Sequence, residues 1–103
     1  MFIAMNRFKV ANGQEAKFEE IWRSRDSKLA DVPGFHSFHM LKGEEAEDHV
    51  LYVSHSMWQN KQVFLDWTRS EAFRAAHKGA GDHRTAYPEA PVLETFETVD
   101  GIS

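Results

Sequence analysis

Residues 35–57, FHSFHMLKGEEAEDHVLYVSHSM, decide the fold, because they predict a β-hairpin in the middle of the chain. Phe35 to Lys42 and His49 to Met57 are both rich in aromatic and branched residues that favour strands. The acidic run from Gly43 to Asp48 between them is typical of a solvated turn. The two strands are therefore expected to pair through a long loop.

An alternating strand and an amphipathic helix precede the hairpin. Residues 2–10 alternate between two faces, which is typical of a strand with one buried side. One face carries Phe2, Ala4, Asn6, Phe8 and Val10, and the other carries Ile3, Met5, Arg7 and Lys9. After a turn at Asn12-Gly13, apolar residues recur at helical spacing from Gln14 to about Asp31, and Pro33-Gly34 is expected to stop this helix.

A second helical segment and a final strand follow the hairpin. The helical segment opens near Asn60, a loop containing Gly79, Gly81 and Pro88 comes next, and residues 92–99 form the last strand. The order βαββαβ predicts an α+β fold with a ferredoxin-like antiparallel sheet and both helical segments on one face. A chain of 103 residues is expected to form a single domain over residues 1–103.

Composition restricts the class of partner. The chain is 42% hydrophobic and 27% charged, which is typical of a globular protein. Its net charge of -4 and the lack of a basic run argue against nucleic-acid binding. No apolar run is long enough to cross a membrane and the first ten residues lack signal-peptide features, so we expect a cytoplasmic protein. The absence of cysteine excludes thiolate metal sites.

Residues 64–77, FLDWTRSEAFRAAH, combine an aromatic stripe with a histidine. If this segment is helical with a break at its serine, Phe64 and Trp67 share one face. Phe73 and His77, four residues apart, also share a face. A histidine beside such a wall is suited to axial ligation of haem iron. The alternative is that the aromatic residues belong to the core and that His77 only caps the last helical turn.

Asn6 is a polar residue on the apolar face of the first strand. An unpaired carboxamide buried there would cost about 1–3 kcal/mol, so something is expected to satisfy it. Neighbouring backbone or a buried water is one explanation. The other is that Asn6 donates into a cavity between sheet and helices, which Trp67 and His77 also border.

The other histidines predict no separate metal site. His36 and His39 lie three apart in an expected strand and therefore face opposite ways. The chain has no H-E-x-x-H motif and no compact carboxylate cluster, which argues against a zinc hydrolase. His83 is the alternative to His77 as an iron ligand, although a helix end positions a ligand better than a glycine-rich loop.

A resemblance to a known family covers nearly the whole chain and rests on Asn6, the PGF run at residues 33–35, Trp67 and Ala76-His77. With these residues the sequence is similar to the haem-degrading monooxygenases of the IsdG type, within the antibiotic biosynthesis monooxygenase superfamily. The resemblance implies a dimeric α+β barrel. The stretch from Lys78 to Tyr87 departs from the pattern of these relatives.

The resemblance also implies a catalytic set. His77 would be the axial ligand of the haem iron, Asn6 a distal hydrogen-bond donor, and Trp67 a wall against the porphyrin. A neutral imidazole can bind iron through one nitrogen, and a carboxamide N–H can stabilise developing negative charge without supplying acid.

Four further residues are expected to bind the cofactor, namely Trp22, Arg25, Phe64 and Phe73. Arg25 matches a position near the haem propionates in relatives, and Trp22 matches a bulky position in their pocket. Haem would be both cofactor and substrate. Because the chain has no flavin or nicotinamide fingerprint, O2 chemistry would need electrons from an external reductase or small reductant.

Three functions stay open on this basis. The first is oxidative haem degradation that cleaves the porphyrin ring and releases iron, and the Ala76-His77 pair favours it. The second is a cofactor-independent monooxygenase of the same superfamily that acts on a polycyclic phenol or quinol. The third is a non-enzymatic haem-binding dimer.

Self-association is expected from the predicted layers. Helices on one face of the sheet leave the other face, with Ile3 and Met5, as exposed apolar surface in a monomer. Packing two such faces together gives a symmetric homodimer.

Overall fold

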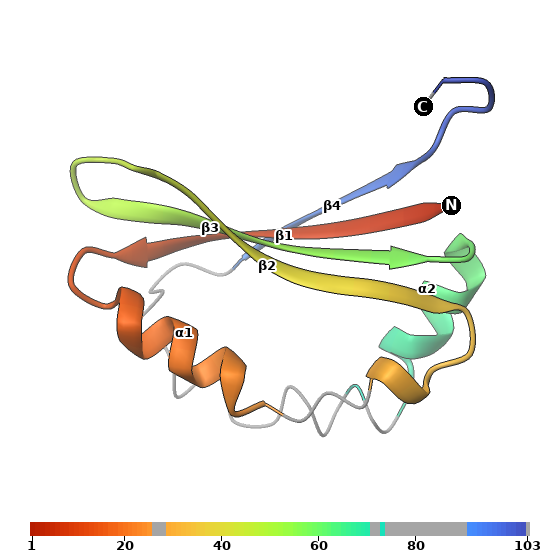
Figure 1. Ribbon diagram of the computed structural model, residues 1–103, viewed down its shortest axis with the longest axis horizontal. Helices are drawn as coiled ribbons and strands as arrows, with labels where there is room; N and C mark the ends of the chain where they lie inside the picture. Colours follow the sequence, from red (N-terminus) through yellow and green to blue (C-terminus); the bar gives the residue numbers. More distant parts are fainter. Residues whose placement is uncertain (26–28, 71–72, 74–90, 103) are drawn as a thin grey trace.

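In the part of the chain that the structure describes, four strands form one antiparallel sheet and two α-helices lie on one of its faces (Figure 1). The computed structural model of the protein describes residues 1–25, 29–70, 73 and 91–102. The strands are β1 (Phe2–Ala11), β2 (Phe35–Glu45), β3 (His49–Trp58) and β4 (Val92–Glu97), in the spatial order β2-β3-β1-β4. The predicted ferredoxin-like α+β fold is confirmed.

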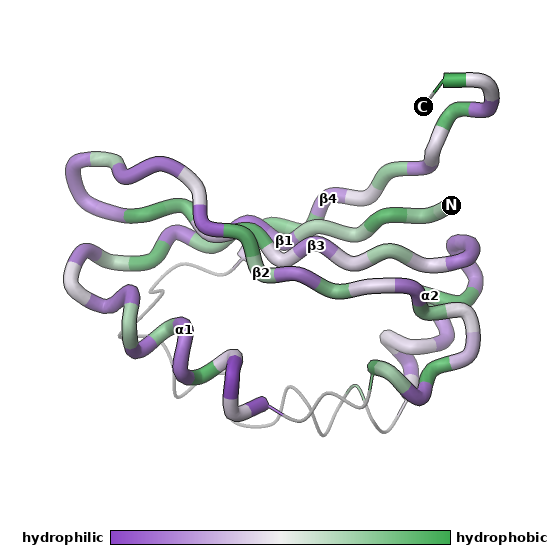
Figure 2. Tube along the Cα trace, viewed as in Figure 1, coloured by the Kyte–Doolittle hydropathy of each residue, from purple (hydrophilic) through white to green (hydrophobic). Residues whose placement is uncertain are grey.

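The helix α1 (Glu15–Arg23) ends earlier than the sequence predicts, so the expectation of a helix reaching Asp31 is wrong. The Ser24 hydroxyl donates to the carbonyl of Glu20 at 2.9 Å, and its N–H donates to the same oxygen at 3.0 Å. Serine competes in this way for backbone groups and favours helix ends. A separate 3-10 turn, η1 (Leu29–Asp31), precedes β2. Figure 2 shows hydrophobic and hydrophilic residues alternating along α1.

The hairpin has a shorter loop than predicted. The expected turn from Gly43 to Asp48 is wrong for its first three residues, which continue β2 to Glu45. A register shift between Lys42 and Glu45 accommodates the acidic run while pairing continues, and the strand therefore twists locally instead of ending. The Ala46 N–H closes the loop by donating to the His49 carbonyl at 2.7 Å.

The helix α2 (Lys61–Thr68) begins at the predicted residue. The Asn60 side-chain oxygen accepts the N–H of Val63 at 3.0 Å, which is a standard N-cap arrangement. After α2 ends, the Ser70 hydroxyl oxygen accepts the N–H of Phe73 at 3.1 Å. The predicted break at this serine is confirmed. None of the described helices is long and apolar enough to cross a membrane.

The core between sheet and helices divides into two clusters. The α1 cluster consists of Phe8, Val10, Phe18, Val50 and Tyr52, with Ile21, Trp22 and Met40 packed against it. The α2 cluster consists of Phe2, Ala4, Trp58 and Trp67, with Leu29, Val32, Phe35, Val63, Phe64 and Phe73 packed against it. None of the residues that the structure describes belongs to both clusters. The sheet therefore has a separate hydrophobic core towards each end.

Neither helix covers the opposite face of the sheet (Figure 1). Ile3 and Met5 on this face are half-buried, and Leu41 and Phe96 are exposed. An ion pair between Arg7 and Glu94, with 3.6 Å between nitrogen and oxygen, crosses the same face. The expected apolar surface is present, while the homodimer stays a prediction.

Candidate active site

Asn6 lies on the strip of sheet between the α1 cluster and the α2 cluster. It is the register partner of Ser54 on β3 and of Leu93 on β4, and Ser54 pairs in turn with Met40 on β2. We call these four residues the central row. Asn6 is half-buried, and its carboxamide makes no hydrogen bond to any described residue. Its amide is therefore available to a ligand on the helix side of the sheet.

An aromatic group lies on the α2 side of the central row. The Trp67 and Phe73 rings meet edge to face with centroids 5.7 Å apart. The buried Trp58 ring lies 5.5 Å from Phe64 and 6.3 Å from Trp67. The predicted shared face of Phe64 and Trp67 is confirmed by their common cluster. Trp67 is only 6% exposed, so little of its surface is accessible to a ligand.

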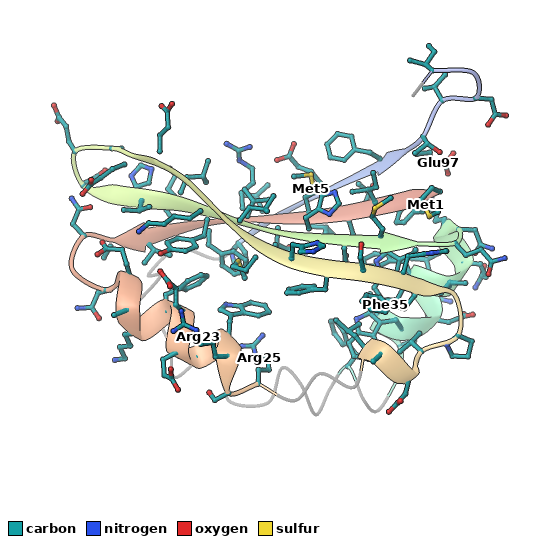
Figure 3. All side chains as sticks on the ribbon, in the orientation of Figure 1. Met1, Met5, Arg23, Arg25, Phe35 and Glu97 are labelled. Carbon is teal, nitrogen blue, oxygen red and sulfur yellow. The ribbon has the colours of Figure 1, made fainter. Side chains whose placement is uncertain are left out.

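Trp22 and Arg25 lie on the α1 side of the central row. Trp22 stacks on Phe38 of β2, with ring centroids 5.8 Å apart and planes 20° apart. The Arg25 guanidinium lies 4.1 Å from the Trp22 ring centre, in a cation–π contact at the end of α1 (Figure 3). Among the described residues, Trp22 Nε1 is the one buried side-chain nitrogen or oxygen without a hydrogen-bond partner. Arg25 forms no ion pair with any described residue and can meet an anion.

A cavity of about 310 Å³ opens beside Trp22, between α1, β2 and β3. It is lined by Glu19, Trp22, Arg23, Phe38, Met40, Lys42 and Tyr52. The Tyr52 hydroxyl donates to the Glu19 carboxylate at 2.6 Å. This hydrogen bond lowers the pKa of Glu19 against the effect of burial, and the charges of Arg23 and Lys42 lower it further. Burial, followed by the bond to Glu19, raises the pKa of Tyr52.

The predicted iron ligand lies outside the described residues. His77 is outside the residues that the structure describes, and so are its alternative His83 and the stretch from Lys78 to Tyr87. In the described part of the chain, no three or more histidine, aspartate or glutamate side chains group together so that they could hold a metal ion. Iron ligation by His77 therefore stays a prediction.

Two features of this region differ from what the sequence predicts. Ser54 shares its face of β3 with Tyr52 and Trp58, so alternation along β3 was a signal for a second polar residue beside Asn6. The hydrogen bond between Tyr52 and Glu19 joins residues 33 positions apart, and no local pattern predicts it.

The aromatic side chains, Asn6 and Arg25 together suit a flat apolar ligand that carries an acidic group at its edge. Aromatic side chains flank the central row on both sides, and such surfaces pack well against planar rings. The guanidinium of Arg25 can pair with a carboxylate. Asn6 adds a hydrogen-bonding group between the two aromatic surfaces.

The amino-acid sequence of this chain is similar to those of known proteins. The family model described as antibiotic biosynthesis monooxygenase matches residues 1–79. A heme oxygenase (staphylobilin-producing) of Staphylococcus haemolyticus is 28% identical over 96 residues, which cover 92% of this chain and 88% of the relative. Heme oxygenase (staphylobilin-producing) 1 of Staphylococcus aureus strain Newman is 31% identical over 77 residues, which cover 75% of this chain and 71% of the relative.

Solved structures share the fold. The heme-degrader MhuD from Mycobacterium tuberculosis, with two hemes bound in its active site, aligns with a TM-score of 0.74 and 23% identity over 100% of both chains. SnoaB, a cofactor-independent oxygenase from Streptomyces nogalater, aligns with a TM-score of 0.66 and 18% identity over 94% of this chain and 92% of its own. At these identities the likeness shows the fold alone.

Proposed function

Because the chain belongs to the antibiotic biosynthesis monooxygenase family, we propose that it is a haem monooxygenase that cleaves the porphyrin ring with O2 and external electrons and releases iron. The predicted relationship to the IsdG type is confirmed by the relatives named as heme oxygenases. The observation that carries the proposal is the amide of Asn6, which lies between two aromatic surfaces and bonds to none of the described residues.

The residues present fit haem. In this proposal the aromatic residues Trp22, Phe64, Phe73 and the accessible part of Trp67 bind the ring, and Arg25 pairs with a propionate. His77 holds the iron. Bound haem supplies the redox chemistry and is itself the substrate.

Asn6 places a polar carboxamide among apolar side chains of the site. Its Nδ2 can donate a hydrogen bond to developing negative charge in the site, and an amide cannot release a proton to that charge. The ring of Trp67, held by Trp58 and Phe73, supplies a rigid apolar wall that keeps water away from the ring of the substrate.

The proposal extends to the protein's partners and location. Residues 1–103 would act as one domain, and two copies would form a homodimer through the uncovered face of the sheet. A reductase or small reductant would supply electrons in the cytoplasm.

Haemin titration tests the proposal. The wild-type protein is expected to shift the Soret band of haemin on binding, and His77→Ala is expected to lose that spectrum while its circular dichroism stays unchanged. His83→Ala is the matched control and should keep the spectrum. A wild-type protein that leaves the haemin spectrum unchanged would rule out the proposed function, and loss of the spectrum in His83→Ala alone would transfer iron ligation to His83.

The cavity beside Glu19 and Tyr52 favours a second candidate, a cofactor-independent monooxygenase for a polycyclic phenol or quinol. Its volume of about 310 Å³ is within the range of small-molecule sites. Haemin titration separates the two candidates, because only the first requires haem. Turnover of bound haem with a reductant then separates the enzyme from a non-enzymatic haem-binding dimer.

A further inference from the structure

Ser54 is the cross-strand partner of Asn6 in the central row. Directly opposed residues on antiparallel strands hold their Cβ atoms about 4.5–5.5 Å apart on the same face of the sheet. A small ligand that meets the Asn6 amide is therefore within reach of the Ser54 hydroxyl as well.

The hydroxyl of Ser54 has no hydrogen-bond partner among the described residues, although Ser54 is only 4% exposed. The other buried serine of β3, Ser56, uses its hydroxyl fully. It donates to the Ala4 carbonyl at 3.1 Å and accepts from Trp58 Nε1 at 2.9 Å. Among the described residues, Trp22 Nε1 is the one fully enclosed side-chain nitrogen or oxygen without a partner, so the Ser54 oxygen is not fully enclosed and a small molecule can reach it. The Ser54 hydroxyl is therefore available to form a hydrogen bond with a ligand.

The position of Ser54 supports the same conclusion. Its neighbours along the same face of β3 are Tyr52, which belongs to the α1 cluster, and Ser56, which is bonded to Trp58 of the α2 cluster. Ser54 itself belongs to neither cluster. Asn6 occupies the same position on β1, between Ala4 and Phe8. Two polar side chains without a partner among the described residues thus lie together on the strip of sheet between the α1 cluster and the α2 cluster.

We propose that Ser54 is a second hydrogen-bond donor of the site and acts with Asn6 on the same small ligand. The ligand class is a diatomic molecule or ordered water that shares the site with haem. Two donors on neighbouring strands fix the orientation of a two-atom ligand, which a single donor leaves free to rotate. This inference rests on the proposed haem function and deepens it.

Carbon monoxide is the probe that tests this role, because a hydrogen-bond donor lowers its C–O stretching frequency. The haem-loaded, reduced wild type is compared by infrared spectroscopy with Ser54→Thr and Ser54→Val, which have nearly equal volumes and differ in the hydroxyl group. We expect the valine variant to raise the C–O frequency and the threonine variant to keep it near the wild-type value. Ser54→Ala repeats the loss of the hydroxyl without added volume.

Ser56→Ala is the matched control, because it removes a hydroxyl that the fold already uses. It should unfold at lower urea concentration while the C–O frequency stays at the wild-type value. If haemin binds normally and the valine and alanine variants both keep the wild-type frequency, Ser54 is no donor and only this inference fails. If the wild type binds no haemin, the proposed function fails and the inference fails with it.

Discussion

The Tyr52 hydroxyl and the Glu19 carboxylate form a hydrogen bond of 2.6 Å that joins β3 to α1. Tyr52 is buried in the α1 cluster, while the Glu19 side chain is 32% exposed at the cavity. The bond therefore links the core to the wall of the cavity. It also makes the attachment of α1 depend on the ionisation of Glu19.

Tyr52→Phe should weaken the fold in a pH-dependent way. The folded-state pKa of Glu19 is lowered, first by the bond from Tyr52, so this stabilisation is present above the unfolded-state pKa and is lost as the pH falls through the folded-state pKa. We expect a loss of about 1 kcal/mol at pH 7, which is below the usual contribution of a charged hydrogen bond because solvent screens Glu19. Urea unfolding at pH 7 and at about pH 3 measures it. An equal loss at both pH values would contradict the role of the carboxylate.

Gly34→Ala should destabilise the junction between η1 and β2. Gly34 has a φ of +86°, and a Cβ atom there would lie 2.8 Å from a methyl carbon of Val63 on α2. The strained backbone and the overlap together should cost about 2 kcal/mol. Urea unfolding measures the change. Gly13→Ala is the control, because Gly13 has a φ of +88° but nothing within 4 Å of the added atom, so it isolates the backbone contribution.

Asn6→Ala should bind haemin almost normally and degrade it slowly. The Asn6 hydrogen bond is expected to act during reaction with O2 rather than on haemin itself, so its loss should affect turnover more than affinity. We expect a decrease of roughly 100-fold in rate, as for the loss of one preorganised donor. The assay follows the Soret band and ferrous iron release with ascorbate or a reductase, O2 and catalase. Equal rates in wild type and variant would indicate adventitious oxidation by a carrier.

Trp67→Phe and Trp67→Ala should differ in both stability and turnover. Because Trp67 is packed against Trp58 and Phe73, removal of the ring should cost about 3–5 kcal/mol, whereas phenylalanine keeps most of the contacts. The phenylalanine variant should also degrade haem faster than the alanine variant. Urea unfolding and the haem assay test the two expectations. Equal stability of the two variants would show that the indole is not part of the core.

The protein without haem should be a dimer at micromolar concentration. Ile3, Met5, Leu41 and Phe96 leave apolar surface on the uncovered face of the sheet, and sheet-to-sheet packing would bury it. Sedimentation equilibrium measures the mass. Met5→Lys should shift the mass towards the monomer, whereas a wild type that sediments as a monomer would contradict the predicted association.

Most of the fold could be predicted from the sequence because its signals are local. Alternation along residues 2–10 predicts the buried face of β1, and the side chain of Asn60 marks the start of α2. The early end of α1 was missed because Ser24 forms its capping bonds only once the helix exists. The extension of β2 to Glu45 was missed because a register shift overrides an acidic composition that favours a turn.

Less of the candidate site could be predicted. The shared cluster of Phe64 and Trp67 follows from helical spacing, and the apolar face around Asn6 follows from strand alternation. The pairing of Asn6 with Ser54 depends on the register between β1 and β3, which alternation alone does not fix. The cavity beside Tyr52 requires three elements to meet, so no single stretch of sequence contains its signal.

The division of the core into two clusters affects how amino-acid substitutions combine in this protein. Because no residue in the described part of the chain belongs to both the α1 cluster and the α2 cluster, substitutions at the two ends of the sheet share no packing partner among those residues. Free-energy changes at separated sites without shared partners usually add. A change in cavity shape around Trp22 and a change in the wall around Trp67 can therefore arise independently. Substitutions near either cluster can therefore alter the binding surface one at a time, while the residues of the central row stay unchanged.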